Sequence, residues 1–287
     1  MRRILIFIMS CSLMTQAQVF RKVSMEKLNG SQPNDCRMAG ISPDGSYILT
    51  TTQTSKGLRR INLQTGEQTQ LTDVQGAGFQ PSISSDGRQI LCRKVTFDKN
   101  HMRQTALQLI DLDKGLQKQF RAPAREVHGY KLDEHDPHAR PRAEVFIEDL
   151  QLMVTVNGVT TNISPNGTDE DTRYIWPSLS PDGQRILYYV SGVGAFVCNL
   201  EGKEVQFIAH DCRAPQWYDD EIIIGMNDQD DGEMLLSSSI MAYSLNGEVQ
   251  ELTDPKDIFM YPQCCAFRGI IACSSANGEI SIMKVEK

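Results

Sequence analysis

The stretch Pro-Ser-Leu-Ser-Pro-Asp-Gly at residues 177–183, followed by Arg-Ile-Leu-Tyr-Tyr at 185–189, decides the fold of this chain. Proline presets the first torsion of a turn and glycine tolerates a positive φ, so Pro-Asp-Gly between two apolar runs predicts a hairpin. Two close copies occur, Ala-Gly-Ile-Ser-Pro-Asp-Gly at 39–45 and Pro-Ser-Ile-Ser-Ser-Asp-Gly at 81–87. Each is also followed by a β-rich run, so the segment is one unit of an internal repeat.

Degenerate copies of the unit begin at Ala214 and Tyr261. Successive copies lie roughly 40 residues apart, the spacing of four-stranded propeller blades. One interval, between residues 81 and 177, is double, and halving it places a hidden copy near Gly129. The spacing therefore predicts six units.

Each unit also carries a second hairpin, whose turn pairs a polar residue with glycine, as at Asn157-Gly158 and Asn246-Gly247. Strands with alternating apolar and polar residues precede these turns, for example at 107–112, and no stretch has a helical period with caps. We therefore predict an all-β fold, a six-bladed β-propeller of four-stranded antiparallel blades.

The two ends of the chain are predicted to meet in the last blade. Residues 280–285 would form the third strand of that blade, and residues 19–25 form a strand ahead of the first unit. We expect this N-terminal strand to add to the edge of the last blade and close the ring, which covers two otherwise exposed sheet edges.

The N-terminus has the pattern of a secretory signal peptide. Arg2 and Arg3 precede an apolar run at 4–9, and small residues then lead up to Ala17. We expect residues 1–17 to be a signal peptide and the protein to be periplasmic or secreted. The apolar run is too short to span a bilayer, and no second stretch approaches that length, so no membrane span is predicted.

A lipoprotein box ending at Cys11 is the rival interpretation, and it fits less well because Met9 is a poor match to such a box. Residues 18–287 are expected to form a single propeller domain. Seven cysteines follow Cys11, and no Cys-x-x-Cys occurs. Three of them lie in apolar strand-like runs and are predicted to be small buried hydrophobic residues, namely Cys92, Cys198 and Cys273. The disulfide pattern is left open.

The Ser-Pro-Asp-Gly turns, the alternating strands and the closing Leu-Thr-Asp at 71–73 and 252–254 resemble the PD40 repeats of TolB-like propellers. The resemblance covers residues 36–287 and is specific for the fold, but it says little about function because these motifs mark turns of the scaffold. TolB has an N-terminal α/β domain, and we expect no counterpart of it here because only residues 18–35 precede the first unit.

Arginines and aromatic residues recur just before the innermost strand of several units. Asp-Cys-Arg occurs at 35–37 and again at 211–213. In a propeller these positions converge on a channel mouth, where guanidinium groups bind carboxylates or acidic peptides.

The predicted ligand-binding residues are Arg37, Arg173, Tyr174, Trp176 and Arg213. The alternative is that each arginine pairs with a neighbouring aspartate, such as Asp35, Asp171 or Asp211. Although Trp176 stands at this entry, both Trp176 and Trp217 are interpreted as core between blades in preference to ligand platforms.

Three of the five histidines cluster at His128, His135 and His138, beside acidic residues. Imidazole and carboxylate groups suit a divalent metal or acid–base chemistry, as in some propeller lyases that act on acidic sugars. A solvated insertion in a degenerate blade explains the same cluster. Residues 227–233 resemble a calcium loop, but Gln229 stands where an acidic ligand is needed, so a polar turn is predicted.

These patterns predict a binding module rather than an enzyme. The net charge of −7 disfavours nucleic acid as a partner, and no Gly-x-Ser-x-Gly elbow occurs. We expect a protein, peptide or glycan ligand and no cofactor. The alternative function is a metal-dependent lyase or hydrolase of acidic saccharides that uses the histidine cluster, with a divalent metal as its cofactor.

Overall fold

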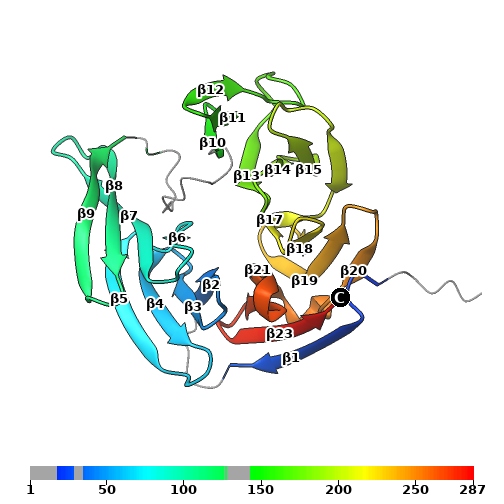
Figure 1. Cartoon of the computed structure of the whole chain (residues 1–287), viewed down its shortest axis with the longest axis horizontal. Helices are drawn as coiled ribbons and strands as arrows, with labels where there is room; N and C mark the ends of the chain where they lie inside the picture. The colour runs from blue at the N-terminus through cyan, green and yellow to red at the C-terminus, as the bar shows by residue number, and fades with distance from the viewer. Residues whose placement is uncertain (1–17, 29–34, 126, 128–142) are drawn as a thin grey trace, which may run out of the picture.

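Six β-sheets stand around a common axis like the blades of a propeller (Figure 1). The structure is a computed structural model that describes residues 18–28, 35–125, 127 and 143–287. Every strand pairing within the sheets is antiparallel. The all-β, six-bladed fold predicted from the repeat spacing is therefore confirmed.

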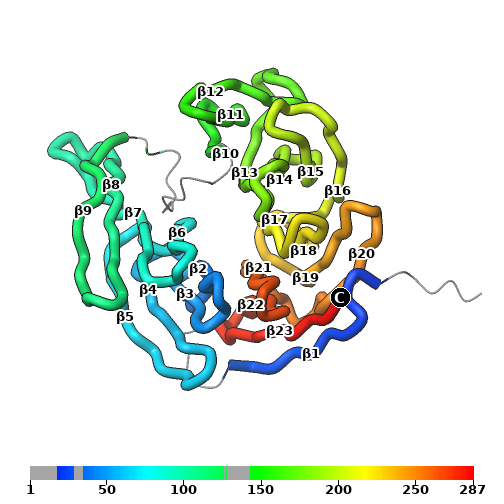
Figure 2. The backbone as a smooth tube through the Cα atoms, viewed as in Figure 1, coloured from blue at the N-terminus to red at the C-terminus, as the bar shows by residue number. Residues whose placement is uncertain are grey.

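Within a blade, the strands follow one another outward from the axis (Figure 2). Blades one and two contain β2 (Cys36–Ile41), β3 (Tyr47–Thr52), β4 (Lys56–Asn62), β5 (Gln68–Gln75), β6 (Ser82–Ile83), β7 (Gln89–Phe97), β8 (Arg103–Asp111) and β9 (Leu116–Ala124). Blades three and four contain β10 (Ala143–Glu148), β11 (Gln151–Val156), β12 (Val159–Asn162), β13 (Tyr174–Leu179), β14 (Arg185–Val190), β15 (Gly194–Asn199) and β16 (Gln206–Ala209). Blades five and six contain β17 (Arg213–Trp217), β18 (Ile222–Asp230), β19 (Leu235–Ser244), β20 (Val249–Glu251), β21 (Phe259–Cys265), β22 (Ile270–Ser275), β23 (Ile280–Glu286) and β1 (Lys22–Lys27).

Blade three has three strands among the described residues, in the order β10-β11-β12. These match the second to fourth strands of the other blades, because the turn at Asn157-Gly158 joins the last two. The innermost strand would fall near Gly129, where the hidden copy of the repeat was predicted, and that position lies outside the described residues. The predicted signal peptide, residues 1–17, also lies outside the described residues.

The repeated serine and aspartate close each Ser-x-Asp-Gly turn with side-chain hydrogen bonds. At the fourth blade, the Ser180 hydroxyl donates to Asp182 Oδ1 (2.6 Å) and accepts from the Arg185 amide (2.9 Å). Gly183 has a φ of +69°, a conformation that favours glycine. The second blade repeats these contacts at residues 84–89. The motif recurs because it ties the first strand of a blade to the second.

Neighbouring blades share hydrophobic cores. Blades one and two enclose Leu49, Leu58 and Ile90, and blades four and five enclose Leu187 and Ile223, all of them fully buried. Trp217 packs against the second of these cores, and its indole Nε1 lies 3.4 Å from the Ser178 carbonyl oxygen of blade four. Trp217 therefore lies between blades, as the sequence predicted.

The N-terminal strand β1 pairs antiparallel with β23 along its whole length, from Lys22 opposite Glu286 to Lys27 opposite Ser281. This is the pairing predicted from the sequence, and Figure 2 shows β1 at the outer edge of blade six. Ahead of it, Phe20 is fully buried against blade five. The Gln250 side chain of blade five accepts from the Phe20 amide (2.7 Å) and donates to its carbonyl oxygen (3.2 Å).

The described cysteines are all free thiols. Cys92, Cys198 and Cys273 are buried in blade cores, as predicted, and burial raises the pKa of each thiol to about 12. These side chains stay protonated and behave as small apolar groups. Among the described residues, no helix is long and apolar enough to cross a membrane.

Candidate functional site

The innermost strands of the blades begin on one face of the ring, and the predicted site residues lie near these starts. Consecutive innermost strands contact each other, β13 with β17, β17 with β21 and β21 with β2. We call the polar and aromatic residues along this arc the inner rim, and it consists of Arg37, Trp176, Tyr189, Arg213 and Tyr261. It extends over blades four, five, six and one.

Backbone bulges shape the inner rim. In four blades the residue just before a proline in, or directly ahead of, the innermost strand has a positive φ, at Gln80 (48°), Trp176 (52°), Ala214 (46°) and Tyr261 (55°). Positive φ is uncommon outside glycine, costs about 1–3 kcal/mol and clusters at ligand sites. The strand register shifts at three of these positions, so the bulges re-aim the side chains at the start of each innermost strand.

Arg37 is a half-buried guanidinium with no carboxylate partner among the described residues. Its Nε donates to the Thr52 carbonyl oxygen (3.1 Å) and its Nη2 to Ser55 Oγ (2.5 Å). The guanidinium carbon lies 4.9 Å from the ring centre of Tyr261 in the neighbouring blade. Burial lowers the pKa of Arg37, because desolvation disfavours the charged form. An anionic ligand would compensate that cost.

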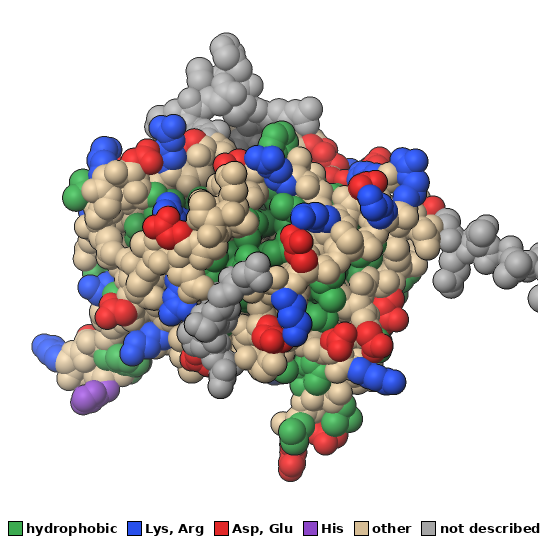
Figure 3. Space-filling model, turned by 90° about the horizontal axis from the view of Figure 1, so that it is seen from below, with side chains coloured by type: hydrophobic (Ala, Val, Ile, Leu, Met, Phe, Trp, Pro, Cys, Tyr) green, Lys and Arg blue, Asp and Glu red, His purple; other side chains and the backbone are tan. Residues whose placement is uncertain are grey.

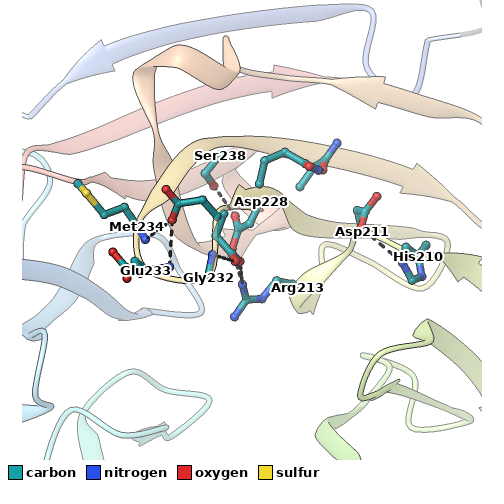
Figure 4. Close-up of polar contacts among 12 residues, drawn as sticks. His210, Asp211, Arg213, Asp228, Gly232, Glu233, Met234 and Ser238 are labelled. Carbon is teal, nitrogen blue, oxygen red and sulfur yellow. Dashed lines mark hydrogen bonds and ion pairs between the residues drawn. The ribbon is translucent and has the colours of Figure 1, made fainter.

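Arg213 lies beside two carboxylates of its own blade (Figure 4). Its Nη1 is 3.5 Å from Asp228 Oδ2 and 3.8 Å from Asp230 Oδ2, both longer than a good hydrogen bond. Asp228 is nearly buried and accepts from Ser238 Oγ (2.6 Å), and burial is the main reason why its pKa is raised. Arg213 therefore has acidic partners, but they are not the predicted neighbour Asp211, whose carboxylate lies 4.0 Å from His210 Nε2.

Trp176 and Tyr189 form an aromatic pair next to Arg213. Their rings meet edge to face with centres 5.4 Å apart, and both side chains are partly exposed. The pKa of Tyr189 is raised by burial, while the nearby charge of Arg213 acts in the opposite direction. Trp176 belongs to none of the buried clusters between blades, unlike Trp217. Its placement therefore suits a platform for a ligand better than the core position expected from the sequence.

Two of the predicted residues, Tyr174 and Arg173, are not part of the inner rim. Tyr174 is completely buried in the core shared by blades three and four, where its hydroxyl accepts from the Asn166 amide and donates to the Gly167 carbonyl oxygen. It has no surface to offer a ligand. Arg173 is exposed, and only its carbonyl oxygen has a described contact, with the Ser191 amide.

The histidine cluster at 128, 135 and 138 lies outside the described residues. Among the residues that are described, no group of three or more histidine, cysteine or acidic side chains is arranged to hold a metal ion. A pocket of about 60 Å³ opens in blade one, lined by residues including Cys36, Lys56 and Gln70. Thr52, whose carbonyl oxygen accepts from Arg37, also lines this pocket.

Sequence reasoning missed Tyr261, Tyr189 and the acidic partners of Arg213. Tyr261 could have been found, because it precedes Pro262 as Trp176 precedes Pro177, and the two residues share the same bulge conformation. Asp228 had no such signal. A polar turn was predicted at residues 227–233, but β18 extends into that stretch and ends at Asp230.

Comparison with known proteins supports the fold and little more. No protein-family model and no curated protein matches the sequence. A protein of unknown function from Bacteroides thetaiotaomicron is similar in structure, with 12% identity over 92% of this chain and 76% of that one and a TM-score of 0.60. A putative TolB from Agrobacterium tumefaciens has 18% identity over 92% and 98% of the two chains and a TM-score of 0.54. An oligogalacturonate lyase in complex with manganese has 14% identity over 86% and 76% and a TM-score of 0.52. The chain has the TolB-like propeller fold.

Proposed function

We propose that this protein is an exported binding module that recognises a protein, peptide or glycan through its inner rim. The observation that carries the proposal is Arg37, a half-buried cation held by Thr52 and Ser55 without a carboxylate partner in the described part of the chain. A guanidinium fixed in this way is arranged to bind a carboxylate of the ligand. The pattern of residues 1–17 supports a periplasmic or secreted location.

The aromatic residues of the inner rim define the rest of the ligand. Tyr261 lies under Arg37, and Trp176 with Tyr189 lies two blades away, next to Arg213. Exposed aromatic faces bind apolar side chains and the flat faces of sugar rings. The two carboxylates beside Arg213 disfavour a second acidic group there. The expected ligand therefore has one acidic group and an apolar or sugar surface, as in an acidic peptide or a uronic-acid glycan.

Replacing Arg37 is expected to weaken ligand binding by about 10–100-fold, the usual cost of losing a hydrogen-bonded charge. Isothermal titration with an acetylated glutamate-rich peptide and with a uronic-acid oligosaccharide measures this loss. Arg37→Lys is expected to fall between Arg37→Ala and the unaltered protein, because lysine keeps the charge without the planar fork.

Arg60→Ala is the matched control, because Arg60 also stacks on a tyrosine of blade one, with its guanidinium carbon 5.9 Å from the ring centre of Tyr47. It is expected to leave the affinity unchanged. Equal affinities of Arg37→Ala and Arg60→Ala, or no binding of either probe to the unaltered protein, would refute binding of an acidic ligand through Arg37.

The alternative function, a metal-dependent lyase or hydrolase of acidic saccharides, makes a different prediction about metal content. A binding module is expected to purify with substoichiometric metal by elemental analysis and to leave a uronic-acid oligosaccharide intact. Stoichiometric metal that disappears in a His135→Ala/His138→Ala variant, together with cleavage of the oligosaccharide by the unaltered protein, would instead support the enzyme.

A further inference from the structure

Two hairpins extend beyond the face that carries the inner rim. The second and third strands have nine residues each in blade two (β7 and β8), and nine and ten in blade five (β18 and β19). The equivalent strands of the other blades have six or seven residues. Three extra residues add about 10 Å to a strand.

The two hairpins project in the same direction from opposite sides of the ring. Both turns join the second strand of a blade to the third, so both lie at the end where the innermost strands begin. Figure 3 shows them as two protrusions at the lower edge of that view. Blades two and five are separated by two blades in either direction around the ring, which places the hairpins across the axis from each other (Figure 1).

The hairpins carry opposite charges. Residues 93–103, here called the basic hairpin, contain four lysines and arginines and one aspartate. Residues 227–237, the acidic hairpin, contain four carboxylates and no cation. On the basic hairpin, Lys94, Lys99 and Arg103 are exposed and have no ion-pair partner among the described residues.

Each hairpin also exposes large apolar side chains near its tip. Phe97 is 66% exposed and Met102 43% on the basic hairpin, and Met234 is 68% exposed and Leu236 59% on the acidic hairpin. Removing apolar side chains of this size from water lowers the free energy of the system and so favours association. Each tip thus combines one sign of charge with apolar contact surface, as the opposite halves of a protein interface do.

We propose that this face binds a second copy of the same chain, with each basic hairpin meeting the acidic hairpin of the other subunit. A two-fold axis that lies between the two faces, perpendicular to the line joining blades two and five, places both pairs of hairpins together at once. Such an isologous contact makes every complementary pair twice. The two inner rims then face each other between the hairpins, and the proposal stands whatever ligand the rims bind.

Reversing the charge of one hairpin tests this dimer. Sedimentation of the unaltered protein is expected to show a dimer that weakens as salt is added. The variant Lys94→Glu/Lys99→Glu/Arg103→Glu has two acidic hairpins, and its dimer dissociation constant is expected to rise at least about 100-fold. The control variant Lys114→Glu/Lys118→Glu/Arg121→Glu changes three exposed cations elsewhere in blade two, and its dimer is expected to persist.

Mixing two variants provides the decisive measurement. Gln229→Lys/Asp230→Lys/Glu233→Lys makes the acidic hairpin basic, so this variant alone is expected to be monomeric. Mixed with the variant that has two acidic hairpins, it is expected to form a heterodimer, which also shows that both variants are folded. A monomeric unaltered protein, a dimer that survives the charge reversal of the basic hairpin, a control that dissociates, or a mixture that stays monomeric would each overturn the proposal.

Discussion

Replacing Phe20 with alanine is expected to lower the free energy of unfolding by about 3–5 kcal/mol, the range for a fully buried phenylalanine. Phe20 is completely buried in the core of blades five and six, and its ring meets that of Tyr218 edge to face at 5.0 Å. The backbone around it is already held by Gln250, so it has little freedom to move in and fill the cavity. Urea denaturation measures the loss.

Phe267→Ala is the control, because that phenylalanine is 79% exposed at a turn of blade six. It is expected to change the free energy of unfolding by less than about 0.5 kcal/mol. If Phe20→Ala were as stable as Phe267→Ala, the residues ahead of β1 would not be packed in the core that blades five and six share.

Replacing Gly225 with alanine is expected to cost about 1–3 kcal/mol, because the added methyl group has no space. Gly225 lies in the middle of β18, and a β-carbon at this position would overlap Cys212 Sγ, which is itself fully buried. Gly40 is the matched control. A β-carbon there would come no closer than 3.4 Å to the nearest side-chain atom, Ile83 Cδ1, so Gly40→Ala is expected to be nearly neutral.

A second substitution identifies the cause of the Gly225→Ala loss. Adding Cys212→Ala removes the sulfur atom that the new methyl group would meet, so the double variant is expected to be more stable than the sum of the two single changes predicts. Thermal or urea denaturation of all four proteins gives this coupling. Strict additivity would mean that residue 225 needs glycine for a reason other than the cysteine beside it.

The turn motif predicted the fold because its residues act locally. The hydrogen bonds of Ser180 and Asp182 and the positive φ of Gly183 all fall within six residues. A short stretch of sequence therefore specifies the hairpin. The spacing of such turns then gives the number of blades. The pairing of β1 with β23 was also predictable, because the last unit had one strand fewer than the others.

The inner rim was only partly predictable, because its contacts join residues far apart in the sequence. Arg37 meets Tyr261 across a blade boundary, and Arg213 meets Asp228 instead of its neighbour Asp211. Tyr174 and Trp176 are two residues apart and both aromatic, yet one is buried and the other is turned toward the rim by a bulge. Local pattern does not reveal which side chain a bulge turns outward.

The pairing of β1 with β23 also sets an order of events during synthesis. Strand β1 emerges from the ribosome before the other described strands, but its partner spans residues 280–286. The described strands of blades one to five each come from one continuous segment, so these strands can pair as they emerge. Blade six cannot form until β23 has been synthesised, and before that β1 and Phe20 have no partner strand or core to bury them. Folding of blade six therefore has to follow synthesis of its last strand, and anything that binds β1 before then would prevent the ring from closing.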